Sequence, residues 1–369
     1  MGVVGVNLGR PHHLEPGRGT ARVVLAVKNF AAIKGVCHIG LGVTATNTQR
    51  VLRRAGYFAE AWATQTAKEL ESKLEAAEAE SSRAGTVRVS HVIVSAPSWV
   101  QPDDFKRLCL TYPNIEFVLL NHSGCAFLSI DKYGIRNNRL CIDLELSVHN
   151  FRVAANNTRV VNWIGRAFSA PCLYLPNLYD TTTFVNPYPR HVLTPGQGGT
   201  LRIGSFGAGR PWKNQLTAAE GAVQLARQLG MELELYVNTK RPDGGERMIE
   251  SRSELFEDLR GCRIVEVPWE AWPRFRTTVG QMHLLLQPSF DETFNVVTAD
   301  GLAAGVPSVT SSSIEWTPQR WWANTCDPGD VVKVGLYLLS DKYAVDEARA
   351  GLTAYVEQGL ERWKGYLGR

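Results

Sequence analysis

Short apolar runs alternate along the chain with longer segments in which apolar residues recur every three or four positions. The short runs are typical of buried strands, and the longer pattern is typical of amphipathic helices. In the first half, this pattern predicts strands over 21–27, 87–95 and 115–121, and helices over 41–55, over 64–83 and from about 102. Strands that alternate with helices favour parallel sheets covered by helices on both faces.

The same alternation begins again after a segment rich in proline and glycine. Residues 168–200 contain five prolines and the run Gly196–Gly199, a composition that predicts a linker. Beyond it, the pattern predicts strands over 201–206, 231–237, 262–267, 283–287 and 307–310, and helices over 213–229, about 245–260, 270–279 and 295–304. The final segment, 341–367, predicts one or two further helices.

The chain therefore divides into two doubly wound α/β domains, and its 369 residues are enough for two separate cores. The predicted boundaries are an irregular extension over 1–20, a first domain over 21–180, a linker over 181–200, a second domain over 201–340 and terminal helices over 341–369. Open sheets of this kind bind ligands beyond the carboxyl ends of their strands.

Composition excludes several classes of protein. With 44% hydrophobic residues and a net charge of +4, the chain is not disordered. Seven widely spread cysteines without a C-x-x-C pair argue against both a disulfide scaffold and a structural zinc site. Because no apolar run is long enough for a membrane helix or a signal peptide, we expect a cytoplasmic protein without a transmembrane segment.

The positive charge is concentrated in the first half. Residues 1–180 carry a net charge of +6, with one arginine cluster at Arg50, Arg53 and Arg54. A basic half favours an anionic partner such as nucleic acid, anionic lipid or a phosphorylated small molecule. A solvated, arginine-rich surface explains the same charge, so both interpretations stay open at this point.

The second predicted domain opens with a glycine-rich turn between a strand and a helix. In Gly204–Asn214, small residues allow backbone amides to approach a ligand, and the following helix begins with free N–H groups. Arg210 and Lys213 add two cations, and Gly207 lies between them and the strand. The turn predicts a diphosphate site, although it lacks the G-x-x-x-x-G-K-[ST] pattern of a Walker loop.

A second turn, which follows the strand predicted at 283–287, carries two carboxylates. Glu292 precedes a predicted helix and Asp300 follows eight residues later, just over two helical turns away. Carboxylates accept hydrogen bonds from sugar and ribose hydroxyls. The backbone amides of Thr293, Phe294 and Asn295 lie where a helix start binds phosphate.

This segment resembles the signature of retaining GT-B glycosyltransferases, in the sucrose-synthase and mannosyltransferase group called family four. The family pattern is P-S-x-x-E-x-F-x-x-x-x-x-E-A-x-A-x-G-x-P-V-V. The matching residues are Pro288, Ser289, Glu292, Phe294, Ala303, Gly305, Pro307 and Val309. The chain departs from the pattern at Asp300, where the family has its second Glu, and at Gly301, where it usually has Ala.

Other segments resemble the same family. Residues 204–219 resemble its phosphate-binding turn and helix, and Leu175–Asp180 resembles the I-P-N-G-V-D that ends its first domain. Gly40 and Gly42 occur where the family has a glycine-rich loop, and His122 follows a strand as the family's donor-sugar histidine does. The final helices match the segment that crosses back to the first domain. The resemblance implies a GT-B fold with two Rossmann-like domains that face a cleft.

The resemblance also implies roles for the site residues. Arg210 and Lys213 hold the diphosphate, Glu292 and His122 contact the donor sugar, and Asp300 holds the ribose. The further donor contacts come from Gly40, Gly42, Gly207, Thr293, Phe294 and Asn295. We expect neither a metal nor a cofactor, because the nearest metal-like motif, Asp143–Glu145, has no nearby partner ligands.

The expected reaction is transfer of a hexose from a nucleotide sugar, with UDP favoured, to a hydroxyl acceptor. The basic first half permits an anionic acceptor, and one candidate is a 5-hydroxymethylated pyrimidine in DNA, which phage-type DNA glycosyltransferases of this architecture modify. A lipid-linked or small-molecule acceptor stays open, as does peripheral membrane contact, although the acidic segment 64–83 is unlike a basic membrane anchor. Three alternatives also remain, namely a non-catalytic nucleotide-sugar-binding protein, an epimerase and a phosphorylase.

Overall fold

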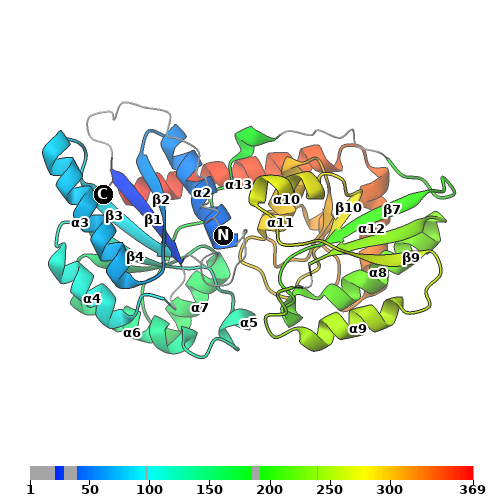
Figure 1. Cartoon of the computed structure of the whole chain (residues 1–369), viewed down its shortest axis with the longest axis horizontal. Helices are drawn as coiled ribbons and strands as arrows, with labels where there is room; N and C mark the ends of the chain where they lie inside the picture. Colours follow the sequence, from blue (N-terminus) through cyan, green and yellow to red (C-terminus); the bar gives the residue numbers. More distant parts are fainter. Residues whose placement is uncertain (1–20, 29–39, 96–98, 185–191, 239, 369) are drawn as a thin grey trace, which may run out of the picture. The chain divides into compact units, whose positions relative to one another are not determined.

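The computed structural model describes residues 21–28, 40–95, 99–184, 192–238 and 240–368. The predicted extension and most of the glycine-rich loop before Gly40 lie outside these residues. The chain forms two compact units (Figure 1). Of the described residues, the first unit contains those up to His122, those of Tyr133–Leu178 and those from Leu360 onward, and the second contains those of Ser123–Lys132 and Tyr179–Gly359.

A six-stranded parallel sheet forms the centre of the first unit, with the strand order β2-β1-β3-β4-β5-β6. Its strands are β1 (Arg22–Lys28), β2 (Phe58–Thr64), β3 (Val89–Ser95), β4 (Glu116–Asn121), β5 (Phe151–Ala155) and β6 (Leu173–Tyr174). Each neighbouring pair is parallel. Apolar side chains fill both faces of the central strands, and Val92, Phe117 and Val153 are fully buried.

Helices connect these strands, and several begin at a residue suited to cap them. They are α2 (Gly40–Arg54), α3 (Ala67–Ala84), α4 (Pro102–Thr111), α5 (Cys125–Leu128), α6 (Gly134–Ser147) and α7 (Thr158–Phe168). Thr66 accepts a hydrogen bond from the Glu69 amide at the start of α3, and Asn157 caps α7 in the same way. Pro102 occupies the first turn of α4, where its missing N–H is not needed.

The second unit contains a five-stranded parallel sheet with the order β11-β10-β7-β8-β9. Its strands are β7 (Thr200–Ser205), β8 (Glu232–Val237), β9 (Cys262–Glu266), β10 (Leu284–Leu286) and β11 (Ser308–Val309). The helices are α8 (Gln215–Leu229), α9 (Glu246–Phe256), α10 (Trp272–Val279), α11 (Val296–Ala303), α12 (Pro328–Ser340) and α13 (Ala344–Leu367). Short 3₁₀ turns occur at Thr181–Thr183, Pro211–Lys213 and Gln319–Trp321.

The last helix belongs to both units, as the prediction of a helix that crosses back requires. In α13, residues up to Gly359 pack with the second unit and those from Leu360 onward with the first. Within the first unit, the Trp363 indole donates a hydrogen bond of 2.9 Å to the Pro176 carbonyl and is almost fully buried.

The structure confirms the predicted class of two parallel α/β sheets and adds elements that the pattern did not predict. The helix predicted from residue 64 begins at Ala67, because Phe58–Thr64 forms the edge strand β2. The helix predicted from residue 213 begins at Gln215, because Asn214 has a left-handed backbone with φ 55°. The pattern also missed α12 and the whole series α5, α6, β5, α7 and β6.

Candidate functional site

In the second unit, the predicted cation and carboxylate meet beyond the carboxyl ends of β7 and β10. Lys213 forms an ion pair with Glu292, and their side chains are only 14% and 11% exposed. The same Glu292 oxygen accepts hydrogen bonds of 3.1 Å from the Ser289 hydroxyl and the Asn295 amide. The carboxylate is therefore held between one cation and two neutral donors in a largely dry setting, where such contacts are strong.

Asn295 fixes the loop that carries Glu292. It has φ 62° and caps α11, because its side-chain oxygen accepts a hydrogen bond of 2.9 Å from the Thr298 amide. Its side-chain nitrogen donates to Gln287 at 3.1 Å, and Gln287 in turn donates to the Phe206 carbonyl at 3.2 Å. This chain joins the ends of β10 and β7. The sequence predicted a role only for the Asn295 backbone.

Asn214 joins the two turns from the other side, although the sequence pattern predicts no role for its side chain. Its side-chain nitrogen donates to the Pro288 carbonyl at 3.0 Å and to the Thr325 carbonyl at 2.7 Å. The Phe290 amide also donates to the Trp212 carbonyl at 2.8 Å. The lysine and the glutamate therefore lie on loops that are cross-linked before any ligand binds.

A layer of hydroxyl groups supports the glutamate loop. The hydroxyls of Ser311 and Ser313 donate to the Ser289 carbonyl at 2.6 and 3.1 Å. The Trp316 indole donates to the Phe294 carbonyl at 2.7 Å. The Phe294 ring is buried beside Trp316, so the donor contact predicted for this residue concerns its backbone amide alone. Thr293 is partly exposed in the same loop.

Arg210 pairs with a carboxylate other than Glu292. Its guanidinium donates to Asp243 at 3.1 Å and lies over the rings of Phe127 and Trp212. Gly207, with φ 120°, donates its amide to the Asn238 side chain at 3.1 Å. The glycine-rich turn thus presents two cations, each with its own acidic partner.

Asp300 lies on α11 and is completely buried. One of its oxygens accepts hydrogen bonds from the Tyr179 hydroxyl at 2.7 Å and the Trp272 indole at 2.9 Å. Burial raises the pKa of Asp300 to about 6, while these two donors and Arg276 act in the opposite direction. Its second oxygen is also buried and has no hydrogen-bond partner in the described part of the chain.

The glycine at position 301, where the family pattern usually has alanine, has a steric reason. A Cβ at this position would lie 2.6 Å from Leu285 Cδ1 and 3.0 Å from the Val306 carbonyl oxygen. Since real Cβ contacts are longer, α11 packs against β10 too closely for alanine without a local shift.

In the first unit, His122 follows β4 at the carboxyl end of the sheet. Its Nδ1 accepts a hydrogen bond of 3.2 Å from Asn156, which follows β5 and also donates to Asn177. Burial lowers the pKa of His122 to about 4, so the imidazole is neutral at pH 7. The ring presents one acceptor and one donor nitrogen rather than a cation.

The remaining predicted residues of the first unit lie on α2. Gly40 and Gly42 form its first turn, and a Cβ on either would meet nothing within 4 Å among the described residues. Arg53 donates to the Ala59 carbonyl at 2.7 Å, which ties the end of α2 to β2. Arg50 and Arg54 are exposed at the end of the same helix.

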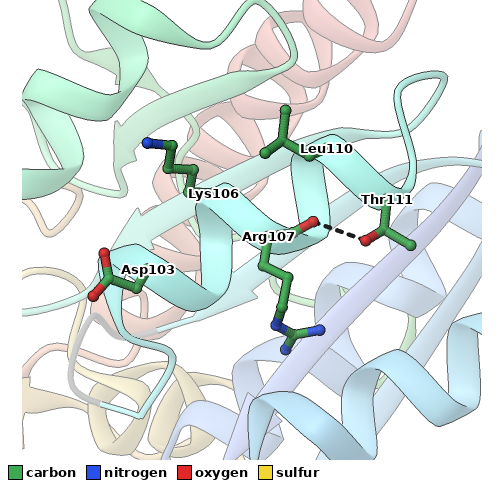
Figure 2. A pocket seen from close by; sticks show the side chains of 5 residues that line it. All are labelled: Asp103, Lys106, Arg107, Leu110 and Thr111. Carbon is green, nitrogen blue, oxygen red and sulfur yellow. Dashed lines mark hydrogen bonds between the residues drawn. The ribbon is translucent and has the colours of Figure 1, made fainter.

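Three further observations concern the described residues only. The described residues contain no cluster of three or more metal-ligating side chains, and none of the helices they form is long and apolar enough to cross a membrane. A surface hollow of about 380 Å³ lies along α4 and is lined by Asp103, Lys106, Arg107, Leu110 and Thr111 (Figure 2). It contains none of the predicted site residues, and its Arg107 already pairs with Glu71 and Asp104.

Comparison with known proteins supports the architecture alone. No family model matches the chain, and no curated protein matches it by sequence. Among solved structures, sucrose-phosphate synthase from Thermosynechococcus elongatus is 14% identical, with a TM-score of 0.64 over 94% of this chain and 98% of that one. The chain has a GT-B fold.

Two further GT-B structures are similar over nearly the whole chain. The catalytic domain of starch synthase IV from Arabidopsis thaliana, bound to ADP and acarbose, is 10% identical, with a TM-score of 0.63 over 95% of this chain and 100% of that one. HepE from Anabaena, in complex with UDP and glucose, is 10% identical, with a TM-score of 0.56 over 91% and 95%. At these identities, the likeness shows the GT-B fold and no particular activity.

Proposed function

We propose that this protein is a glycosyltransferase that moves a sugar from a nucleoside diphosphate to a hydroxyl acceptor. The observation that carries the proposal is the pair of Lys213 and Glu292, fixed by Ser289 and Asn295 beyond the ends of β7 and β10. This pair occurs in a fold whose solved neighbours include a sucrose-phosphate synthase and a starch synthase.

The charges suit the chemistry of such a transfer. The bond between the anomeric carbon and the diphosphate oxygen breaks, the acceptor oxygen bonds to that carbon, and the acceptor proton passes to the departing diphosphate. Negative charge then develops on the departing diphosphate, which Lys213 and Arg210 stabilise by position and charge. Glu292 accepts hydrogen bonds from donor-sugar hydroxyls. The neutral His122 binds a hydroxyl group without adding charge.

We further propose retention of configuration, a hexose donor with UDP favoured, and no metal. Retention rests on the resemblance of residues 288–309 to the family-four signature. UDP is favoured because HepE, of the same fold, was solved with UDP and glucose, although starch synthase IV was solved with ADP. Lys213 and Arg210 supply the positive charge that a divalent ion supplies elsewhere.

For the acceptor, we propose a 5-hydroxymethylated pyrimidine in DNA, on the basis of the net charge of +6 over residues 1–180. DNA binding of this kind weakens steeply as salt increases, because phosphate contacts release counterions. A small neutral acceptor has no such dependence. Transfer measured over a salt series, with hydroxymethylated DNA and with neutral sugars and lipid-linked sugars as acceptors, distinguishes these cases.

The first test is a thermal-shift panel of UDP, GDP, TDP, CDP and ADP on the wild type and on Glu292→Gln. A ligand at 100 times its Kd stabilises the folded protein by about 2.7 kcal/mol, which is readily measured. We expect one diphosphate to raise the Tm of the wild type, and its sugar conjugate to support transfer that Glu292→Gln loses. If no diphosphate shifts the wild type, the proposed function is wrong. Binding without transfer to any acceptor favours the non-catalytic binding protein.

A further inference from the structure

A second loop lies directly against the predicted diphosphate turn. This loop connects β8 to α9, and its Arg241 carbonyl accepts a hydrogen bond of 2.7 Å from the Gly209 amide. A Cβ on Gly245 would lie 2.4 Å from the Gly209 carbonyl oxygen, so only glycine fits at this position. The two backbones therefore touch on both sides of residue 209, and the side chains beside them are neighbours.

One carboxylate oxygen in this loop holds two arginines together. Asp243 Oδ2 accepts hydrogen bonds from Arg210 at 3.1 Å and from Arg241 at 2.8 Å. The three side chains carry a net charge of +1. Two guanidinium groups that share one anionic oxygen form a cationic pair, and the donors that remain suit a second anion of phosphate geometry.

Arg241 is the less compensated member of the pair. Its side chain is only 15% exposed, and its Nε is buried without a hydrogen-bond partner in the described residues. Burial lowers the pKa of Arg241, Asp243 acts in the opposite direction, and the charge of Arg210 adds to the effect of burial. A buried guanidinium with an unmade hydrogen bond is costly, and a bound anion would remove much of that cost.

Aromatic rings hold both guanidinium groups in place. Arg241 lies over Trp269 at 5.1 Å, and Arg210 lies over Phe127 at 5.3 Å and Trp212 at 5.7 Å. A ring face fixes the plane of a guanidinium and leaves the N–H groups at its edge available for hydrogen bonds. The pair is therefore pre-organised, and a ligand loses little entropy in ordering it.

We infer that Arg241 is a second diphosphate-binding residue, which acts with Arg210, and that Asp243 is the positioning residue that orients both. The inference rests on the proposed function for the identity of the ligand, a nucleoside diphosphate. No sequence motif pointed to Arg241, because it lies 31 positions after Arg210 in a different loop.

The test is calorimetric titration of the full chain with UDP, GDP, TDP, CDP and ADP and, separately, with inorganic pyrophosphate. Loss of hydrogen bonds to a charged group predicts that Arg241→Ala weakens binding of the diphosphate that binds and of pyrophosphate by about tenfold or more. Arg241→Lys keeps the charge without the planar fork, so it falls between wild type and alanine. Arg247→Ala, an exposed arginine of α9 that pairs with Glu250 and Glu254, is the matched control and leaves both affinities unchanged.

The outcomes separate this inference from the proposed function. If a nucleotide binds the wild type and Arg241→Ala equally well, Arg241 has no ligand role and the proposed function is untouched. If only pyrophosphate binds, and binding depends on Arg241, the anion site stands and the nucleotide function falls. If neither probe binds the wild type, both proposals are wrong. If Arg241→Ala does not fold, the lysine variant decides the question.

The positioning role of Asp243 is tested by a separate pair of variants. Asp243→Asn removes the charge that holds two repelling guanidinium groups together, so Tm should fall, and the nucleotide affinity of the folded protein should fall severalfold as well. Asp243→Glu should restore part of both. A merely structural role would lower Tm and leave the affinity of the folded fraction unchanged. Tighter binding in Asp243→Asn would show that the carboxylate competes with the ligand, and would overturn its positioning role.

Discussion

The burial of Asp300 makes a quantitative prediction about how stability depends on pH. The pKa of this carboxyl rises from 3.8 to about 6 on folding, chiefly because burial disfavours the charged form. Each pKa unit corresponds to about 1.4 kcal/mol, so the charged form costs the folded state about 3 kcal/mol relative to the protonated form.

The sign follows from proton binding. Between pH 4 and 6, the folded state holds a proton on Asp300 that the unfolded state has released, so stability falls as pH rises through this window. The stabilising contribution is fully present below pH 4 and is lost above about pH 6. In Asp300→Asn this dependence disappears, and the amide oxygen still accepts the hydrogen bonds from Tyr179 and Trp272.

The assay is chemical unfolding of wild type and Asp300→Asn at several pH values from 4 to 7, followed by tryptophan fluorescence and circular dichroism. The free energy of unfolding of the variant minus that of the wild type should grow by about 3 kcal/mol over this range. Asp143→Asn removes an exposed carboxyl from α6 and reports what the loss of any single charge does. A difference for Asp300→Asn that stays flat with pH would refute the reasoning.

Three further predictions follow from the same structure. Burial lowers the pKa of His122 from 6.5 to about 4, so the free energy of unfolding should rise with pH across that interval. In His122→Gln, unfolding experiments should show a rise that is smaller by about 3 kcal/mol. Glu292→Ala and Lys213→Ala should each lower kcat/KM for sugar transfer by about two orders of magnitude or more, because each removes one partner of the Lys213–Glu292 ion pair. Wild-type turnover in either variant would contradict the assignment. Gly301→Ala should lower the free energy of unfolding by about 1 to 3 kcal/mol in a thermal or chemical melt, because the new Cβ meets β10. Gly365→Ala, in open space on α13, should raise it by about 0.5 to 1 kcal/mol. Equal effects of the two substitutions would refute the packing argument.

Much of the second unit could be predicted because its signals are local. The strands and helices around the predicted diphosphate turn follow from apolar periodicity, and Lys213 and Glu292 each follow a strand whose end is set by its own sequence. Parallel strands bring their carboxyl ends to one edge of the sheet, so residues that follow β7 and β10 meet there. The ion pair between them is a consequence of that rule.

The partners of the other site residues could not be predicted, because they come from distant segments. Arg210 was expected to act beside Lys213, yet its carboxylate partner is Asp243, and the ring of Phe127 comes from Ser123–Lys132, a segment that packs with the second unit. Asp300 was expected to hold the ribose, because it matches the family's second acidic position and lies just over two helical turns after Glu292. Spacing gives the side of a helix, and only the packing of Tyr179 and Trp272 buries that side.

The sequence by itself determined the class of the fold, the alternation of its elements and the loops that carry its chemistry, because backbone periodicity and turn residues act over a few positions. The tertiary structure alone decided which charged groups are paired, which are buried from water and which pair with two partners. Those properties depend on contacts between residues far apart in the chain, such as Tyr179 with Asp300, or Arg210 with Asp243. The energy of a charge is set by its surroundings, and a linear sequence does not contain them.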